Sequence, residues 1–316
     1  MRTGAARGHA GHFHEAGFYG SDTEFRALIV PFAEEGIAAG EPVIIGYDGR
    51  KNALVRSWLT DPSAVTFLAD SGVYATPARA IAAYRRLFEF HVAQGAGQIR
   101  ITGELPHPGN GGRFDGWDRY EAAVNTVWQD FPVWGLCLYD TAIMPPVMLD
   151  VAERTHPRIV SPQAPAARTA ASRRSRISKL SPRPRSTGTD HAHDRTGRQV
   201  RSRGSGALIQ IGGGRVADTI LDDLLLGVTV AVSNALVHGR PPTTVRIWAA
   251  PDRIVISVHD QGHGPADPLA GLVPAPRGTA TLGLGLWIIH QLDIDIALRH
   301  ADDGFTVRLR GGTTIG

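Results

Sequence analysis

Three short groups of residues in the C-terminal third of the chain have types and spacings that suit nucleotide binding. They read NALVHG (residues 234–239), DQGHG (260–264) and GLGL (283–286). The amide oxygen of Asn234 can complete the coordination of a magnesium ion that phosphates and water mainly hold. Asp260 only accepts hydrogen bonds when ionised, so it suits the exocyclic amine of an adenine.

The glycines in these groups favour close approach of the backbone to a ligand. Gly262 and Gly264 would let the chain approach the base, because they carry no side chain. Gly283 and Gly285 are expected to open a helix and to present its amides and positive dipole end to phosphates. Each feature alone is ordinary, since glycine pairs usually mark turns and a single asparagine is usually a surface residue. Together they predict one nucleotide pocket.

The elements that must position these residues follow from hydrophobic periodicity. Residues 218–239 form a helix-like run in which Asn234 and His238, four apart, share one face. Alternating apolar residues predict strands at 244–249 and 253–260, followed by a loop at 261–282 and two further strands joined across 301–304. Antiparallel strands backed by helices on one side make an α+β two-layer sandwich.

The three groups, in the order NxxxHG, DxGxG and GLGLW, resemble the N, G1 and G2 boxes of the Bergerat-type (GHKL) histidine kinase-like ATPase fold. The loop at 265–281 is similar to the lid of the anti-sigma-factor serine kinases. The resemblance implies binding of ATP with Mg²⁺, with Asn234 as the metal ligand. The nucleotide-binding residues that it implies are Asn234, His238, Gly239, Asp260, Gly262, Gly264, Gly283, Leu284 and Gly285.

The sequence departs from that family at the position of the general base. Catalytic members carry a glutamate one turn before the asparagine, and here Val230 occupies that place and cannot accept a proton. Asp223 lies seven residues earlier, about 10 Å along a helix axis, and Asp222 is rotated away from that face. We therefore expect nucleotide binding with weak or lost phosphoryl transfer and assign no catalytic residue. The stretch GALIQIGGG (206–214) also stands where the family usually has a further helix.

The first half of the chain alternates predicted strands and helices. Strands are expected at 42–47, 64–68, 98–102 and 133–139, and helices at 51–59, 77–94 and 117–131. A further helix at 22–40, with Ser21 or Asp22 as its cap, contains Pro31, which should kink it or divide it into two. This alternation predicts a largely parallel α/β sheet that ends near residue 156.

Ligands of such a sheet bind at the carboxyl ends of its strands. These ends carry Glu104 and Asp140, which are candidates for binding a small molecule. The alternative is that both carboxylates cap helices or pair with Arg100 and Arg113. No GxxxxGK[ST] motif occurs, so a phosphate-binding loop is not supported.

Five stretches in this half, HFHEAGFY (12–19), PFAEEGIAAGEPVII (31–45), RITGE (100–104), CLYDT (137–141) and RTHP (154–157), resemble the MEDS sensory domain. Leu138 replaces the usual proline of the fourth stretch. The family is a RecA-like α/β module without an ATP-binding loop that occurs in bacterial regulators. The resemblance implies a sensory role and leaves the sensed molecule open.

Residues 158–206 hold twelve Arg or Lys and two Asp, a net charge of +10, whereas the whole chain carries +3, so the remainder is acidic. Their Ser, Pro, Arg and Gly content predicts a basic disordered linker. A basic tract could attract nucleic acid or an anionic membrane, but without aromatic interleaving or an amphipathic face we expect a solvated linker that can dock on an acidic partner. The histidines of HAGHFH (9–14) and DHAHD (190–194) lack a cysteine or third ligand at metal-binding spacing.

These observations predict three segments: a MEDS-like domain at 1–157, a linker at 158–206 and an ATPase-like domain at 207–316. The single cysteine and the lack of a signal or membrane-spanning run favour a cytoplasmic protein. The expected function is that of an ATP-binding regulator resembling anti-sigma-factor serine/threonine kinases, with a sigma factor or its antagonist as partner and no sequence-specific nucleic acid or membrane. A homodimer and a small-molecule ligand of the first domain stay open. The alternatives are a sensor histidine kinase, although no HE[LI]RTP phosphoacceptor box occurs, and a non-enzymatic nucleotide-gated partner switch.

Overall fold

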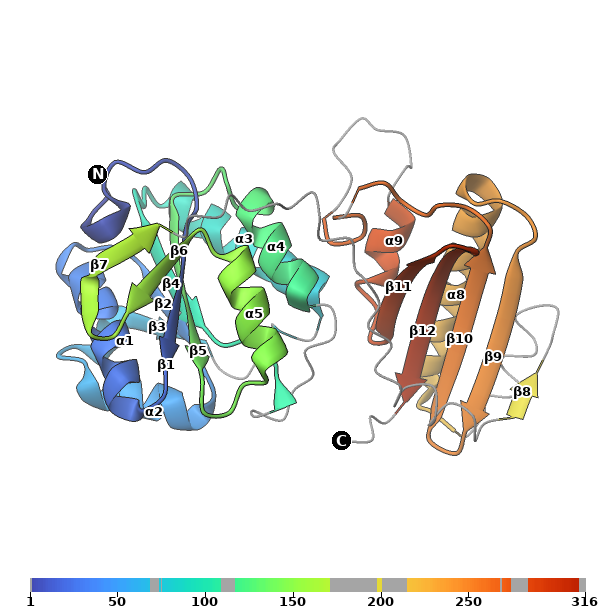
Figure 1. Ribbon diagram of the computed structural model, residues 1–316, viewed down its shortest axis with the longest axis horizontal. Coiled ribbons are helices and arrows are strands. Elements are labelled where there is room, and N and C mark those ends of the chain that lie inside the picture. The colour runs from blue at the N-terminus through green and yellow to red at the C-terminus, as the bar shows by residue number, and fades with distance from the viewer. Residues whose placement is uncertain are drawn as a thin grey trace. The chain divides into compact units, whose positions relative to one another are not determined.

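The computed structural model describes residues 2–68, 74, 76–108, 117–170, 198–200, 215–267, 269–273 and 284–312. The chain divides into two compact units, residues 1–177 and 178–316, which are drawn in Figure 1 and described one at a time below.

The first unit is built on one seven-stranded sheet in the order β3-β2-β4-β5-β1-β6-β7. Six strands run parallel and β7 runs antiparallel to β6, which confirms the predicted α/β class. The strand β1 lies between β5 and β6 and was not predicted, because polar residues interrupt its apolar pattern. The strands are β1 (Phe13–Tyr19), β2 (Val43–Gly46), β3 (Val65–Phe67), β4 (Ile99–Gly103), β5 (Val133–Asp140), β6 (Arg158–Ser161) and β7 (Ala164–Ala170).

Within the described ranges of this unit, five α-helices join these strands: α1 (Asp22–Ala38), α2 (Gly49–Trp58), α3 (Pro77–Ala93), α4 (Trp117–Val127) and α5 (Pro146–Thr155), with short 3-10 turns at Gly4–Ala6 and Pro62–Ala64. Ser21 caps α1 through its side-chain oxygen, as the sequence predicted, and Thr76 caps α3 in the same way. The helix α1 continues through Pro31, so the division into two helices was wrong. Pro31 lies on the exposed side, while buried residues on both sides of it, among them Phe25 and Phe32, hold the two halves in one helix.

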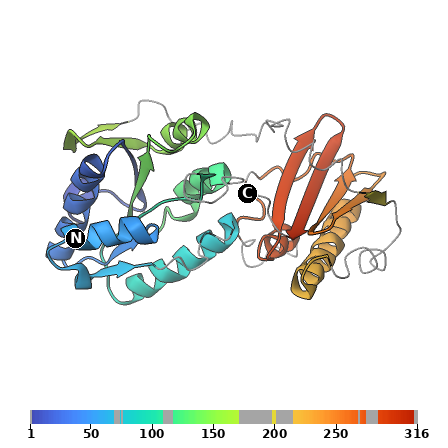
Figure 2. The ribbon, with the colours of Figure 1, turned by 90° about the horizontal axis from the view of Figure 1, so that it is seen from below.

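The sheet of the first unit is covered by helices on both faces, as Figures 1 and 2 show. Side chains of β5 alternate between the faces, as they must in a strand. Trp134, Leu136 and Leu138 join the core beneath α1 and α2. Cys137 and Tyr139 belong to the cluster with Met148 of α5 on the opposite face. This alternation places one potential metal ligand, Cys137, under the second layer of helices.

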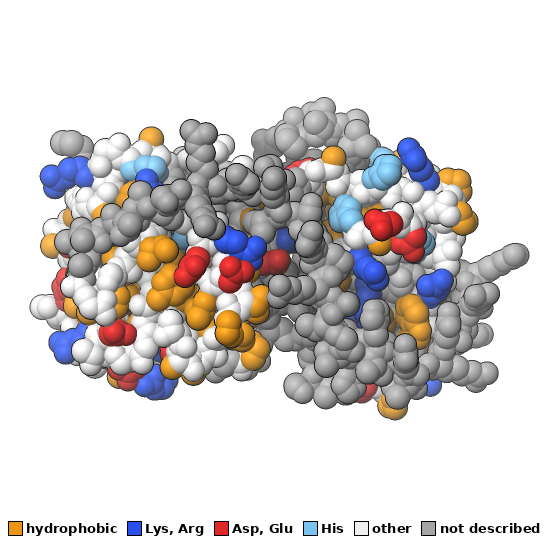
Figure 3. All heavy atoms as spheres, in the orientation of Figure 1, with side chains coloured by type: hydrophobic (Ala, Val, Ile, Leu, Met, Phe, Trp, Pro, Cys, Tyr) orange, Lys and Arg blue, Asp and Glu red, His pale blue; other side chains and the backbone are white. Residues whose placement is uncertain are grey.

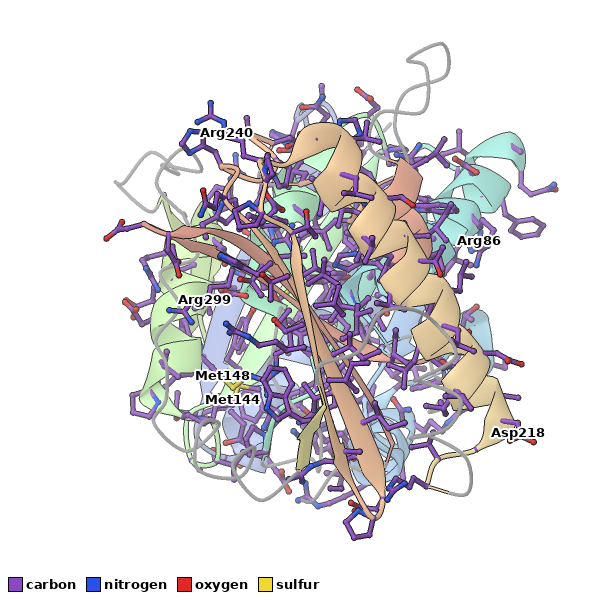
Figure 4. The ribbon with its side chains drawn as sticks, turned by 90° about the vertical axis from the view of Figure 1, so that its right-hand side faces the viewer. Arg86, Met144, Met148, Asp218, Arg240 and Arg299 are labelled. Atoms are coloured by element: carbon purple, nitrogen blue, oxygen red, sulfur yellow. The ribbon has the colours of Figure 1, made fainter. Side chains whose placement is uncertain are left out.

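The described residues of the second unit form one antiparallel sheet, in the order β11-β12-β10-β9-β8, and two helices. The predicted α+β two-layer sandwich is therefore confirmed, and Figure 4 shows α8 lying along the sheet from Asp218 towards Arg240. Its elements are β8 (Arg198–Val200), α8 (Asp218–His238), β9 (Thr244–Ala250), β10 (Arg253–Asp260), α9 (Leu284–Ile289), β11 (Asp295–Ala301) and β12 (Gly304–Gly312).

The helix α8 is the central element of this unit. Leu224, Val228 and Ala231 are buried against sheet residues such as Ile256 and Leu309. By length and composition alone α8 could cross a membrane, but the core helix of a soluble protein meets the same test. Since one face of α8 packs into the core of the unit, we interpret it as such a helix.

The structure differs from the expected linker at residues 158–206. The strand β6 pairs with β1, and Val160 is buried, so the sheet of the first unit continues past the expected boundary. Ile159 and Val160 provide the apolar surface that a disordered segment would lack. At the other end, β8 pairs with β9 of the second unit. The remaining linker positions, 171–197 and 201–206, lie outside the described residues.

The surface of the first unit carries a few exposed apolar side chains on the face seen in Figure 3. Ile143, in the turn before α5, and Val147, in its first turn, are each close to half exposed. Isolated side chains of this kind are ordinary on soluble proteins, so we assign them no function.

Candidate nucleotide-binding site

Asp260 is the centre of the candidate site in the second unit. It ends β10 opposite Phe305 of β12 and is buried, with 5% of its surface exposed. Its Oδ1 atom accepts hydrogen bonds from the backbone N–H groups of Gly262 (2.7 Å) and Arg240 (3.2 Å). Within the described part of the chain, Oδ2 makes no hydrogen bond. The carboxylate is thus held by one oxygen, and the other is available to a donor.

Two glycines make room for this carboxylate. A Cβ atom on Gly262 would lie 2.6 Å from Asp260 Oδ1, and one on Gly239 would lie 2.5 Å from Asp260 Cγ. Gly239 ends α8, and the N–H of Gln261 donates to the carbonyl of Arg240 at 2.8 Å. The structure therefore brings the groups at 234–239 and 260–264 together around one carboxylate.

Asn234 lies close to Gly285, which belongs to the third group of residues (283–286). A Cβ atom on Gly285 would lie 2.7 Å from Asn234 Oδ1 and 3.0 Å from Val230 Cγ1. The absence of a side chain at Gly285 thus lets the start of α9 approach α8 at the predicted metal-binding residue. Leu284 is partly exposed beside it, and the predicted Gly283 lies outside the described residues.

The two remaining predicted residues lie at the margin of this arrangement. His238 is exposed at the last position of α8, beside Gly239. Gly264 has a φ of +67°, a left-handed conformation that favours glycine, and its Cα packs directly on Phe305. Gly264 therefore shapes the turn after Asp260. Of the expected lid at 265–281, residue 268 and residues 274–281 lie outside the described part.

The position of the missing general base is filled by a hydrocarbon side chain. Val230 is half-buried and packs with the core of the second unit. Asp223 is directed elsewhere, because its Oδ2 accepts a hydrogen bond from the backbone N–H of Asp293 at 2.7 Å. Asp222 is exposed. That neither carboxylate replaces the base stays a prediction.

The candidate residues of the first unit have internal partners. The Lys51 ammonium donates to both oxygens of Glu104, at 2.7 and 2.9 Å, and His107 Nε2 lies 3.3 Å from Glu104 Oε1. Burial tends to raise the pKa of Glu104, but His107 and Lys51 outweigh it and lower that pKa overall. Asp140 accepts from the N–H of Ala142 at 3.0 Å, which caps the turn that follows β5. Both carboxylates thus have hydrogen-bond partners within the domain.

The partners of these carboxylates differ from those expected. Arg100 is fully buried and donates to Glu41 at 2.6 Å, so it does not pair with Glu104. The sequence could not show this, because Glu41 lies 59 residues before Arg100 and only the pairing of β2 with β4 brings the two together. Arg113 lies outside the described residues.

One group of polar residues was not anticipated as a unit. His14, Glu121, Cys137 and His156 converge beneath the helices of the first unit. Their separation along the sequence hides them from a search by spacing. The available signal was that three of them, His14, Cys137 and His156, lie in the short stretches that resemble the sensory domain.

Comparisons with known proteins assign the two parts of the chain. A family model described as MEDS, the MEthanogen/methylotroph, DcmR Sensory domain, matches residues 13–157. A second, described as a histidine kinase-like ATPase domain, matches residues 207–310. A search of curated proteins found no match. The chain therefore carries a MEDS sensory domain followed by a histidine kinase-like ATPase domain.

Proposed function

We propose that this chain is a cytoplasmic regulator whose C-terminal domain binds ATP with Mg²⁺ and controls transcription through a sigma factor or its antagonist. The match to a histidine kinase-like ATPase domain supports an ATP-binding, kinase-like regulator. The observation that carries the proposal is the closure of Gly239 and Gly262 around Asp260. The similarity of residues 265–281 to the lid of anti-sigma-factor serine kinases supports the proposed partner class.

The residues of the site fit the nucleotide in three ways. Asp260 Oδ2 would accept a hydrogen bond from the exocyclic amine of adenine. Gly262 keeps the space beside this carboxylate free of a side chain. The amide of Asn234 would supply one oxygen to Mg²⁺, and Gly285 leaves that amide uncovered by a Cβ atom. When bound, ATP supplies the phosphoryl group and the metal ion neutralises its charge.

Phosphoryl transfer to a serine or threonine would be weak or lost in this proposal. A general base contributes about 100- to 10,000-fold to such a rate, and Val230 cannot act as one. The same observation favours a second candidate function, a non-enzymatic switch in which nucleotide sets the conformation that a partner recognises. A sensor histidine kinase is the third, and its phosphoacceptor box is missing from the sequence, since His14 and Glu15 are followed by AGFY.

Titration of the purified chain with Mg·ATP by calorimetry tests nucleotide binding. We expect Asp260→Asn to lower the affinity about 100-fold, since an amide nitrogen cannot accept from the adenine amine. Asn234→Ala should remove the dependence of affinity on Mg²⁺ while leaving binding of the base. Asp302→Asn, the same chemical change at an exposed turn, is the matched control. Equal affinities for the wild type and Asp260→Asn would refute the assignment.

Incubation with radiolabelled ATP separates the three functions. Label that enters an added anti-sigma antagonist in an alkali-labile, acid-stable form indicates serine or threonine phosphorylation. Acid-labile label on the chain itself indicates a phosphohistidine and favours the histidine kinase. Binding of nucleotide with no transfer, together with nucleotide-dependent retention of a sigma factor or antagonist, indicates the partner switch.

A further inference from the structure

Four side chains from four elements of the MEDS domain converge at one buried point. His14 comes from β1, Glu121 from α4, Cys137 from β5, and His156 follows the last residue of α5. One nitrogen, oxygen or sulfur atom of each lies within 4.8 Å of the other three. His14, Glu121 and His156 are each at most 2% exposed.

The separations of these atoms match those around a metal ion. Bonds of about 2.0–2.3 Å to nitrogen, oxygen and sulfur in a tetrahedral zinc site place neighbouring donors about 3.3–3.6 Å apart. Here His14 Nε2 lies 3.3 Å from Cys137 Sγ and 3.8 Å from Glu121 Oε2. His156 Nε2 lies 3.6 Å from the same carboxylate oxygen. These three separations are within a few tenths of an ångström of the tetrahedral values, and the remaining donor pairs lie within 4.8 Å of each other.

Hydrogen bonds behind His14 fix which of its nitrogens faces the cluster. Asn125 Nδ2 donates to the carbonyls of Glu121 (3.1 Å) and Thr155 (2.8 Å), so its Oδ1 is the acceptor that faces His14 Nδ1 at 3.0 Å. His14 Nδ1 thus carries the proton, and Nε2 presents its lone pair to the other three groups.

His156 and Glu121 are oriented in the same manner. His156 Nδ1 donates to the carbonyl of Ala152 at 2.8 Å, which leaves the lone pair on Nε2. The hydroxyl of Tyr139 donates to Glu121 Oε1 at 2.8 Å, which leaves Oε2 for the cluster. Outer hydrogen bonds of this type hold metal ligands in position in known sites.

Two of the inward-facing atoms have no hydrogen-bond partner among the described residues. These atoms, His156 Nε2 and Glu121 Oε2, are fully buried. A buried polar atom without a partner is rare because its desolvation is not compensated. Two such atoms that face the same point, beside an imidazole and a thiol, call for a ligand that accepts several lone pairs at once.

We propose that His14 Nε2, His156 Nε2, Glu121 Oε2 and Cys137 Sγ bind one divalent transition-metal ion, with Zn²⁺ preferred. Imidazole, carboxylate and thiolate are the ligand types that Zn²⁺ takes in proteins. Binding would release one proton from the Cys137 thiol and one from the Glu121 carboxyl, where it is protonated. The two negative charges then balance the charge of the ion, and a neutral site is compatible with its burial.

A cavity of about 40 Å³ adjoins the proposed metal site. Three of the ligands, His14, Glu121 and Cys137, line it together with Tyr74, Tyr84 and Tyr120. This volume can hold water or a few non-hydrogen atoms. A small molecule in the cavity would thus lie directly beside the metal ion.

Cobalt substitution of the untagged full-length chain is the decisive experiment. The protein is stripped with a chelator, dialysed, and titrated with Co²⁺ and then with Zn²⁺. Because Cys137 is the sole cysteine, a thiolate-to-cobalt charge-transfer band can come only from this position. We expect the band to saturate at one Co²⁺ per chain and to disappear on addition of one equivalent of Zn²⁺. No band at saturating Co²⁺ would overturn the proposal, and this result requires no variant to fold.

Variants confirm the remaining ligands. Cys137→Ser should abolish the band, and His156→Gln should weaken Zn²⁺ binding at least 100-fold in a chelator competition. His91→Gln, a histidine of α3 that does not face the cluster, is the matched control and should bind as the wild type does. Zn²⁺ binding that is unchanged in the His156→Gln and Cys137→Ser variants would place the metal at other histidines and refute the site.

Discussion

The two domains build their candidate sites in opposite ways. The MEDS domain buries charged and polar side chains that pair with one another, as Lys51 does with Glu104 and Arg100 with Glu41. The ATPase-like domain surrounds one carboxylate, Asp260, with backbone N–H groups and glycines. The first site thus depends on side chains that are present, and the second on side chains that are absent. Removing side-chain atoms should therefore weaken the site of the MEDS domain, and adding side-chain atoms should weaken the site of the ATPase-like domain.

The largest expected effect comes from adding a side-chain group that the second site lacks, a carboxylate at the position of Val230. If Val230 occupies the place of a general base, Val230→Glu should raise ADP formation from Mg·ATP about 100- to 10,000-fold. The measurement is steady-state ADP release by the purified chain. Val237→Glu, which adds the same group at an exposed position of α8, should leave the rate unchanged. Equal rates in the wild type and Val230→Glu would show that more than a base is missing.

The next effect tests the dependence of the MEDS domain on paired side chains. Glu104→Gln leaves the buried ammonium of Lys51 without its counter-charge, which typically costs about 3–5 kcal/mol in the free energy of unfolding. Denaturant unfolding followed by tryptophan fluorescence measures the loss. Glu89→Gln, which breaks the exposed pair with Arg85, should cost about 0.5 kcal/mol or less. Similar losses in the two variants would contradict the comparison.

Adding atoms to the second site should have a smaller effect. Gly285→Ala places a Cβ 2.7 Å from the Asn234 amide, and such overpacking costs about 1–3 kcal/mol. We expect the affinity for Mg·ATP to fall about tenfold or more while the domain stays folded. Gly49→Ala, where a Cβ would meet open space, is the control in the other domain. An unchanged affinity would show that the space at Gly285 is not needed for metal binding by Asn234.

The smallest expected effect is a dependence of stability on acid. The pKa of Glu104 is lower in the folded domain than its ordinary value of 4.5. A carboxyl group of this kind contributes stability above its unfolded pKa, and the contribution is lost as the pH falls through the folded pKa. Unfolding at pH 3 to 6 should show a slope of at most about 1.4 kcal/mol per pH unit from this group. The slope should be shallower in Glu104→Gln, and an identical slope would assign the acid sensitivity to other groups.

The sequence predicted both fold classes and the spatial association of its C-terminal motifs. Asn234, Asp260 and Gly285 could be predicted because each lies in a short motif, and the elements beside these motifs have regular apolar periodicity. The metal-type cluster was not accessible, since its ligands come from four separate elements and only the order of the sheet brings β1 beside β5. The strand β6 within the expected linker was not predicted, because two apolar residues, Ile159 and Val160, are enough to extend an existing sheet. In both cases the pairing of strands that are distant in the sequence determined the structure, and local composition does not show which strands pair.

The hydrogen bond from Asp293 N–H to Asp223 has a consequence for the order of α9. The described part of this helix has six residues, too few to be stable alone, and it is held to α8 at two places, near Asn234 by Gly285 and beyond its last turn by Asp223. The amide hydrogens of α9 should therefore exchange with solvent only when α9 separates from α8. Hydrogen exchange of α9 with and without nucleotide would then report occupancy of the site, even in a protein that never turns its nucleotide over.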